Sequence, residues 1–302
     1  MFIGKKLTPT STIGIIAPSG CSDDSTIDSY ISEFKKLNFN VCYNKSLYQK
    51  YGYLAGYDID RANDLMEMFK DPKIDGIICF RGGFGAIRML PYLDIKLIQK
   101  NAKFFCGYSD ITLLLNYFAQ NKIPTFHGPL IKSDFAKDSQ TLPILKYLMQ
   151  NPSKGFTYDF KENFVINNKS ATGILMGGNL STICSSIGTR YEINLSSSIL
   201  LLEEINEAPY VVDRLISQLL LCKTILKCRA ILLGHFTNCV SNQSDNFDIK
   251  ELLISKLKKL NIPIIFDVPF GHDYPNYTFP LGIRAHYSSN TKKLHLIENA
   301  LL

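Results

Sequence analysis

The sequence lacks several features that mark familiar classes of protein. It has no long block of basic residues, and its formal net charge is only +6 over 302 residues. This pattern speaks against a nucleic-acid surface and mildly favours acidic ligands. The N-terminus has no apolar stretch followed by a small-residue cleavage site, and apolar runs such as 199–202 are far too short to cross a bilayer. We therefore expect a cytoplasmic protein with no nucleic-acid or membrane partner.

Signatures of metal and cofactor binding are also missing. None of the eight cysteines forms a C-x-x-C pair, and Cys79, Cys106 and Cys184 lie in apolar segments, as buried reduced thiols do. No His, Cys and Asp residues occur at metal-ligand spacing. The glycine-rich segments match neither the dinucleotide fingerprint nor a P-loop. We expect no metal ion and no cofactor.

The first half of the chain alternates between short β-branched runs and amphipathic segments. Strands are predicted at 12–17, 39–43, 74–80, 103–107 and 123–126, and helices at 27–37, 58–69 and 110–119. This alternation is typical of βαβ units around a mainly parallel sheet. At 302 residues, two domains are expected.

A second alternating region begins at residue 172. It predicts strands at 173–176, 198–202, 230–233 and 262–268, helices at 180–187, 212–220 and 249–260, and a terminal β-hairpin from 282–287 and 293–297. Between the two regions, 131–171 holds one predicted helix and a polar run. We therefore divide the chain into a domain at 1–135, a linker at 136–171 and a second domain at 172–302.

Ligands of open α/β sheets bind beyond the carboxyl ends of the strands, so the residues at those ends are the first candidates for a site. Ser109 follows one predicted strand and precedes an apolar helix. A serine at such a sharp turn presents its hydroxyl to solvent, as in G-x-S-x-G hydrolases. The segment here is Gly107-Tyr108-Ser109-Asp110-Ile111, which lacks the second glycine. A helix-capping role for Ser109 or Asp110 is the alternative.

Three further strand ends carry residues suited to catalysis. Arg81-Gly82-Gly83-Phe84-Gly85 could bring backbone N–H groups close to an anion, or could be a plain tight turn. Glu203 follows four aliphatic residues, so its carboxylate needs a hydrogen-bond partner, for which a histidine or a basic residue would serve. His272 follows the strand predicted at 262–268. Spacing alone does not choose between His127, His235 and His272.

Eight segments in one order resemble the LD-carboxypeptidase family of serine peptidases, which includes the microcin-immunity peptidases. They share their order and nearly span the chain: Ile15-Ile16-Ala17-Pro18-Ser19, Tyr53-Leu54-Ala55-Gly56 with Asp60-Arg61-Ala62-Asn63-Asp64-Leu65, Arg81-Gly82-Gly83-Phe84-Gly85, Gly107-Tyr108-Ser109-Asp110-Ile111-Thr112, His127-Gly128-Pro129, Gly177-Gly178-Asn179-Leu180-Ser181, Leu202-Glu203-Glu204 with Pro209-Tyr210 and Asp213-Arg214, and Pro269-Phe270-Gly271-His272.

The resemblance implies a fold, a site and a substrate. It implies a Rossmann-like parallel-sheet N-terminal domain, a smaller C-terminal β/α domain, and a homodimer. The family's serine falls on Ser109, its glutamate on Glu203 and its histidine on His272. The family often has Glu-Asp where this chain has Glu203-Glu204, so either glutamate could contact the histidine; we favour Glu203.

The implied reaction removes D-alanine from the L-centre of the diamino acid, diaminopimelate or lysine, in murein tetrapeptides during peptidoglycan recycling. Backbone N–H groups of Gly83 and Asp110 are the expected oxyanion donors. Arg81, Gly82 and Gly83 are the expected substrate-binding residues.

Three other functions are compatible with parts of this pattern. A relative could cleave a microcin-type peptidyl nucleotide, and Pro209-Tyr210 with Asp213-Arg214 leans towards the murein enzymes instead. A non-catalytic two-domain binding protein would explain the glycine loops but not the serine, glutamate and histidine. An amidotransferase would need a cysteine at the strand–helix turn, whereas Cys106 lies within the predicted strand.

Overall fold

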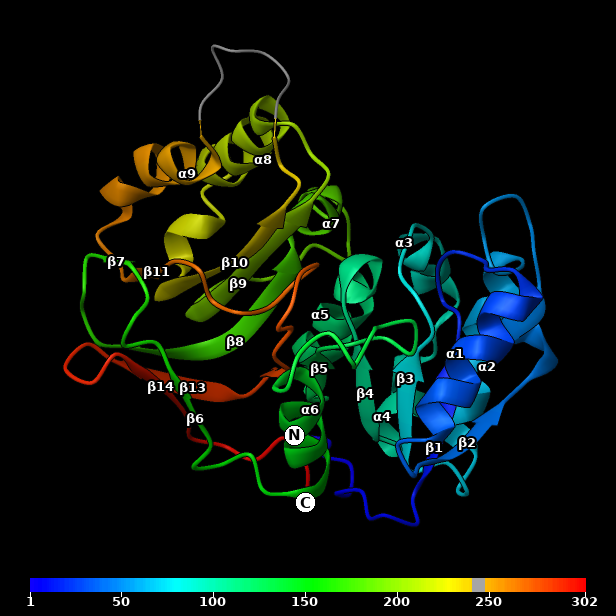
Figure 1. Ribbon diagram of the computed structural model, residues 1–302. Helices are drawn as coiled ribbons and strands as arrows, with labels where there is room; N and C mark the ends of the chain where they lie inside the picture. The colour runs from blue at the N-terminus through cyan, green and yellow to red at the C-terminus, as the bar shows by residue number, and fades with distance from the viewer. Residues whose placement is uncertain (241–247) are drawn as a thin grey trace.

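The computed structural model of the protein describes residues 1–240 and 248–302. It contains a six-stranded and an eight-stranded sheet, each with its own helices, lying side by side (Figure 1). The two chain ends lie together, and Lys6 N donates to Leu302 O at 2.8 Å. The expectation of a mixed α/β protein with two domains and mainly parallel sheets is confirmed.

The first sheet has the order β12-β5-β4-β3-β1-β2. Five of its strands are parallel, and only the edge strand β12 is antiparallel to its neighbour. The strands are β1 (Thr12–Ile16), β2 (Asn40–Tyr43), β3 (Gly76–Cys79), β4 (Phe104–Gly107), β5 (Thr125–His127) and β12 (Phe279–Leu281). The strand order reverses between β1 and β3, and an α/β sheet binds ligands beside such a reversal.

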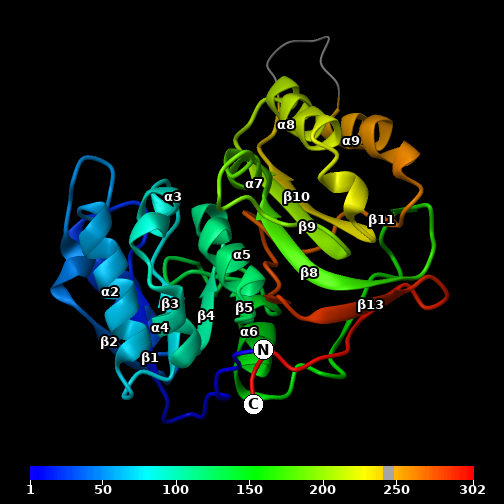
Figure 2. The same ribbon diagram turned by 180° about the vertical axis from the view of Figure 1, so that it is seen from behind.

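Helices cover both faces of this sheet. They are α1 (Asp24–Lys35), α2 (Asp58–Lys70), α3 (Ala86–Met89), α4 (Ile95–Lys100) and α5 (Thr112–Gln120), with short 3₁₀ turns η1 (Lys45–Tyr48), η2 (Leu90–Tyr92) and η3 (Ser109–Ile111). Helix α1 lies in front of the sheet in Figure 1, and α2 and α4 lie in front of it in the reverse view of Figure 2. Because both faces are covered, β3 and β4 are buried along their whole length.

The second sheet has the order β6-β14-β13-β8-β9-β10-β11-β7, with β8 to β11 parallel. Its strands are β6 (Thr157–Asp159), β7 (Val165–Ile166), β8 (Ala171–Asn179), β9 (Ser198–Ile205), β10 (Ala230–Thr237), β11 (Ile264–Ile265), β13 (Arg284–Ser288) and β14 (Lys293–Leu296). Its helices are α7 (Leu180–Ser185), α8 (Pro209–Leu221) and α9 (Ile249–Leu257), with 3₁₀ turns η4 (Ile225–Lys227) and η5 (Lys258–Leu260). The predicted terminal hairpin is confirmed by the antiparallel pairing of β13 and β14.

The segment 136–171, predicted as a linker, contains α6 (Thr141–Gln150) and the edge strands β6 and β7. Beside β7, the strand predicted at 262–268 is much shorter than expected, because β11 spans only Ile264–Ile265. Pro263 and Pro269 flank this stretch and have no N–H to donate, and Asp267 has a positive φ of 56°.

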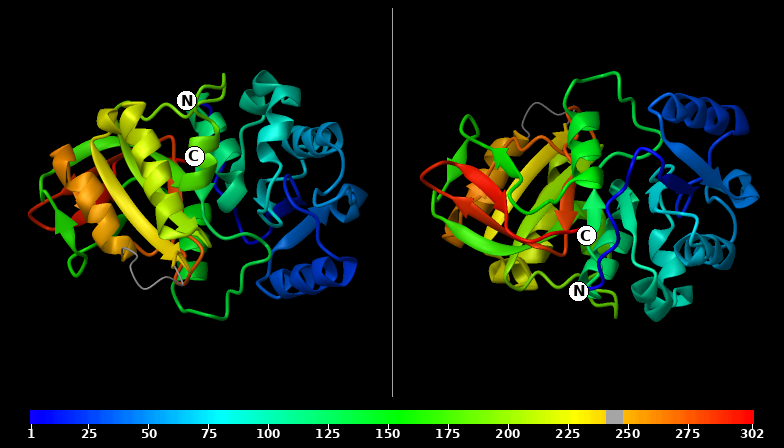
Figure 3. Two further views of the ribbon diagram at one scale, coloured as in Figure 1. Left: turned by 90° about the horizontal axis from the view of Figure 1, so that it is seen from above. Right: turned by 90° about the horizontal axis from the view of Figure 1, so that it is seen from below.

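The two sheets are joined because the chain returns from the second sheet to add a strand to the first. Strand β12 comes from the C-terminal part of the sequence but pairs with β5 in the first sheet. Views from above and below show the two sheets side by side (Figure 3). Among the described residues, no helix has both the length and the apolar character needed for a bilayer crossing.

Candidate active site

Ser109 occupies a sharp turn between β4 and α5. Its φ is 64°, a left-handed value that is uncommon for any residue other than glycine. Gly107, two residues earlier, is fixed because its carbonyl accepts a hydrogen bond from Gly128 N at 3.0 Å. A non-glycine residue persists in such a conformation only where the surroundings enforce it, and these positions are concentrated at functional sites.

The glycine loop that follows β3 lies directly against Ser109. A methyl group added at Gly82 would come within 2.9 Å of Ser109 Oγ, so the bare backbone of Gly82 is what touches the serine. Asp110 ties the loop to the serine's turn, because its Oδ2 accepts from Ala86 N at 2.8 Å and from Ser19 Oγ at 2.6 Å. Burial raises the pKa of the Asp110 carboxyl, and these two hydrogen bonds oppose that rise.

His272 is held by a carboxylate from the end of β9. Its Nδ1 lies 2.6 Å from Glu203 Oε2, and Glu203 is fully buried. The other oxygen, Oε1, has no hydrogen-bond partner among the described residues. A methyl group at Gly271, whose φ is 115°, would fall 2.9 Å from the same carboxylate, so glycine is needed for this approach. A buried carboxylate whose one partner is an imidazole is well placed to orient that ring.

Glu204, the alternative left open by the sequence, faces a different part of the protein. Its two oxygens accept hydrogen bonds from Asn179 Nδ2 at 2.8 Å, from Ser181 N at 2.8 Å and Ser181 Oγ at 2.6 Å, and from Ile205 N at 3.0 Å. Two of these donor residues, Asn179 and Ser181, lie at the start of α7. The geometry therefore gives Glu204 a role in holding that helix and gives Glu203 the contact with His272.

The other two candidate histidines lie outside the cavity that holds Ser109. His127 is fully buried, and neither ring nitrogen has a partner among the described residues. Burial, with a smaller effect from nearby His272, lowers the pKa of His127 to about 3. His235 Nε2 lies 3.1 Å from the carbonyl of Pro275. Of the three, His272 is the one that shares a cavity with the serine.

That cavity has a volume of about 220 Å³. Ser109, His272, Arg81, Gly82 and Gly83, all predicted from the sequence, line it. Glu203 and Asp110 are not lining residues. Glu203 contacts His272, and the Asp110 side chain contacts the end of the glycine loop. Four lining residues were not predicted: Tyr108, Leu130, Lys132 and Ser133. Three of these follow the His127-Gly128-Pro129 motif at the end of β5, and this strand-end position was a signal that could have identified them.

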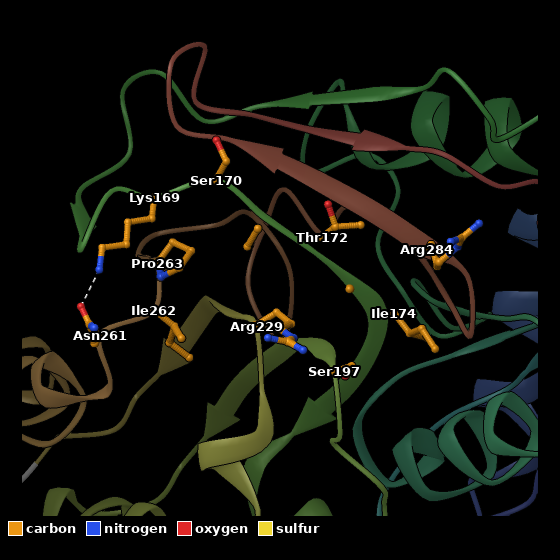
Figure 4. A pocket seen from close by; sticks show the side chains of 12 residues that line it. Lys169, Ser170, Thr172, Ile174, Ser197, Arg229, Asn261, Ile262, Pro263 and Arg284 are labelled. Atoms are coloured by element: carbon orange, nitrogen blue, oxygen red, sulfur yellow. Dashed lines mark hydrogen bonds between the residues drawn. The ribbon is translucent and has the colours of Figure 1, made fainter.

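A larger cavity in the second sheet is a separate feature. It measures about 530 Å³ and includes Arg229, Lys169 and Asn261, the last two joined by a 2.6 Å hydrogen bond (Figure 4). Arg229 precedes β10 and Ser197, also in its wall, precedes β9. This cavity therefore opens at the amino ends of the parallel strands, whereas the candidate site lies at the carboxyl ends, where α/β proteins place their chemistry.

The geometry brings together a hydroxyl, an imidazole and a buried carboxylate, the groups needed for acyl transfer through a serine. Beside them, Gly83 N makes no hydrogen bond within the described chain, and Asp110 N lies at the start of η3, where helical N–H groups are free. No three His, Cys, Asp or Glu side chains of residues 1–240 and 248–302 are grouped so as to hold a metal ion.

Comparison with protein families gives two matches that together cover most of the chain. Residues 13–128 match the LD-carboxypeptidase N-terminal domain, and residues 172–287 match the LD-carboxypeptidase C-terminal domain. The sequence is also 34% identical over 286 residues to the probable murein peptide carboxypeptidase of Bacillus subtilis (strain 168), covering 93% of this chain and 90% of the relative.

Solved structures with the same arrangement include a muramoyltetrapeptide carboxypeptidase from Oxalobacter formigenes. The TM-score is 0.84 at 30% identity, covering 97% of this chain and 100% of that one. The microcin C7 self immunity protein MccF, in complex with aspartyl sulfamoyl adenosine, gives a TM-score of 0.91 at 23% identity, with both chains fully covered. At that identity the second likeness concerns the fold alone.

Proposed function

The chain belongs to the LD-carboxypeptidase family of serine peptidases, and we propose that it removes the terminal D-alanine from murein tetrapeptides with Ser109, His272 and Glu203 as its catalytic triad. One observation supports the proposal most directly. Ser109 and His272 line the same small cavity, and the Glu203 carboxylate contacts Nδ1 of the His272 ring. These three groups come from positions separated by 94 and 69 residues.

The proposed mechanism follows from the orientation of His272. With Nδ1–H donating to Glu203, Nε2 is left as an acceptor on a residue that lines the same cavity as Ser109. Nε2 takes the proton of Ser109 as the hydroxyl attacks the amide carbonyl, and later returns it to the departing amine. Glu203 fixes the tautomer and stabilises the imidazolium. Water then attacks the acyl-enzyme, with His272 again acting as the base.

The negative oxygen of the tetrahedral intermediate requires donors that are already in place. We assign these to the backbone N–H groups of Gly83, which lines the cavity with Ser109, and of Asp110, which follows Ser109 and whose side chain holds Ala86 N at the end of the glycine loop. Each such donor contributes on the order of 10²–10³ in rate. Arg81, Gly82 and Gly83 would contact the bound peptide.

The proposed substrate has a diamino acid, diaminopimelate or lysine, whose L-centre is joined to D-alanine. The names of the Bacillus subtilis and Oxalobacter formigenes proteins support a murein peptide. From the family resemblance we further propose a role in peptidoglycan recycling in the cytoplasm, performed by a homodimer. Sedimentation of the purified protein and fractionation of cells would test the assembly and the location.

The decisive test is incubation of the purified protein with defined murein tetrapeptide, followed by mass spectrometry. The expected product is the tripeptide that has lost one alanine. A matched sample of the Ser109→Ala variant should give no product. Intact tetrapeptide after prolonged incubation with active-site-competent protein, verified by fluorophosphonate labelling of Ser109, would contradict the proposed substrate.

The fold shared with MccF makes a peptidyl-nucleotide amide a second candidate substrate. It belongs in the same assay, as aspartyl sulfamoyl adenosine supplied in parallel with the tetrapeptide. Turnover of the nucleotide conjugate alone would favour this alternative. Absence of turnover of both substrates, together with no labelling of Ser109, would favour a non-catalytic binding protein.

A further inference from the structure

Two positively charged side chains line the cavity that holds Ser109. Arg81 and Lys132 both contribute to its wall. They start from adjacent backbone segments, because Lys132 N donates to Phe80 O at 3.0 Å and Phe80 immediately precedes Arg81. The fold thus brings a guanidinium-bearing and an ammonium-bearing residue to the wall of the catalytic cavity from neighbouring segments.

Neither cation forms an ion pair with a described residue. Arg81 Nη1 donates to Cys21 O at 2.7 Å, but its Nη2 has no acceptor within the described parts of the chain. Lys132 Nζ has no hydrogen bond or ion pair in residues 1–240 and 248–302. Partial burial lowers the pKa of the exposed Lys132 and the charge of Arg81 lowers it further, whereas the charge of Asp23 opposes both effects. The described residues lining the cavity include no carboxylate. Two like charges in a cavity wall that includes no acid favour an anion.

The geometry of the peptide and the small volume of the cavity determine where that anion would lie. In a peptide that loses its last residue, the attacked carbonyl carbon and the terminal carboxylate carbon are one residue apart, at most about 3.6 Å along the chain. A group that binds the terminal carboxylate must therefore lie beside the serine, within the same cavity of about 220 Å³. Among the described residues that line this cavity, Arg81 and Lys132 are the ones that carry a positive charge.

We infer that Arg81 and Lys132 together bind the α-carboxylate of the residue to be released, and that Lys132 is the side chain that makes the enzyme an exopeptidase. The inference rests on the proposed function. The two cations contribute differently: Arg81 presents a planar fork already anchored on Cys21 O, whereas Lys132 provides a point charge on a flexible stem. Substitution of Arg81 would also disturb the anchored loop. Substitution of Lys132 mainly removes the charge, since its Nζ bonds to no other described residue.

The test compares two peptides that differ only in that charge. One is the tetrapeptide with a free D-alanine carboxylate, and the other is the same peptide ending in D-alaninamide. For Lys132→Met, the ratio of kcat/KM for the acid to kcat/KM for the amide should fall by about 10- to 100-fold, the effect of one charge-assisted hydrogen bond. Lys132→Arg should restore most of the ratio. Lys70→Met, at an exposed position at the end of α2, should leave it at the wild-type value.

Three outcomes would overturn the inference. The first is an unchanged ratio in Lys132→Met. The second is an equal loss for acid and amide, which would indicate a general effect on the site. The third is an effect seen only with diaminopimelate and not with lysine in the peptide, which would assign the charge to the side-chain carboxylate of the diamino acid.

A binding measurement keeps this inference separate from the proposed reaction. Calorimetric titration of the Ser109→Ala protein with the same acid and amide peptides requires no turnover. The acid should bind more tightly than the amide, and adding Lys132→Met should remove about 10- to 100-fold of that preference. If wild-type protein cleaves neither peptide, the proposed function fails; if Ser109→Ala binds acid and amide equally, the carboxylate site fails.

Discussion

Replacing Gly82 with alanine would place a methyl group against the serine that we propose as nucleophile. The added Cβ would lie 2.8 Å from Ser109 Cβ and 2.9 Å from Ser109 Oγ. Gly82 is not among the glycines with a positive φ, so alanine can adopt its backbone conformation. The substitution therefore acts through steric crowding of Ser109 and not through backbone strain. Either the loop or Ser109 has to move.

The required movement sets the size of the effect. Carbon atoms in contact prefer separations of about 3.5–4.0 Å, so the pair must separate by roughly 0.7 Å. Misplacement of a reacting group by about 1 Å costs on the order of 10²-fold in rate. We expect kcat/KM of Gly82→Ala to fall by about 10²-fold or more, measured as release of D-alanine. The cost in unfolding free energy should be about 1–3 kcal/mol, the range for overpacking, measured by urea denaturation.

A second glycine supplies the matched control. Gly155 has a φ of 93° and no atom of the described residues within 4 Å of an added Cβ, and its N–H donates to Leu296 O in β14 of the second sheet. Alanine there should cost roughly 1–2 kcal/mol of stability through backbone strain, with catalysis unchanged. A folded Gly82→Ala protein that retained more than a tenth of wild-type kcat/KM would refute the argument that this contact positions the serine.

The remaining predictions concern the triad and the histidine behind it. Ser109→Ala and His272→Ala should each lower kcat by at least about 10³-fold with little change in melting temperature, and Ser109→Ala should abolish fluorophosphonate labelling. Glu203→Gln should lower kcat by about 10²–10⁴-fold, whereas Glu204→Gln should mainly lower the melting temperature; the reverse pattern would exchange their roles. The pKa of His127 is lowered from 6.5 to about 3. Between these values the unfolded chain binds a proton that the folded chain does not, so stability falls as pH drops from 6.5 towards 3. From pH 7 to pH 5, His127→Gln should therefore lose about 2 kcal/mol less unfolding free energy than the wild type in urea denaturation. Equal losses would show that His127 titrates normally in the folded protein.

The order of strands and helices was largely predictable because hydrophobic periodicity is a local signal. Residues 27, 31 and 34, spaced as one face of a helix, are the buried positions of α1. Hydrophobic periodicity failed to predict strands whose limits are set by backbone pairing with a neighbouring strand and not by the character of their side chains. The run 262–268 is apolar enough for a long strand, but β11 is confined to Ile264–Ile265 between two prolines. The edge strands β6 and β7 span only three and two residues, which is too short for any periodicity to identify them.

The choice between Glu203 and Glu204 was beyond the sequence for a related reason. In a strand with one solvated face, alternation would tell which residue points inward. In β9 both faces are covered, and both glutamates are buried. What distinguishes them is which neighbour each meets, the loop carrying His272 or the start of α7. That depends on how separate elements pack, information that no local pattern contains.

The same limit applies to the assembly of the site. Ser109 begins the turn that leads into α5, whereas Glu203 lies near the carboxyl end of β9 in the other sheet. Asn116 on α5 joins the two, because its Nδ2 donates to Gly177 O and its Oδ1 accepts from Gly177 N, each at 2.8 Å. One element further, Asn179 of β8 is the register partner of Glu203. The distance between nucleophile and acid is thus fixed through α5, β8 and β9 in turn. Asn116 is a single buried amide on an apolar helix. Its residue type gives no sign of this role, so the sequence could identify the chemical groups but not the contact that brings them together.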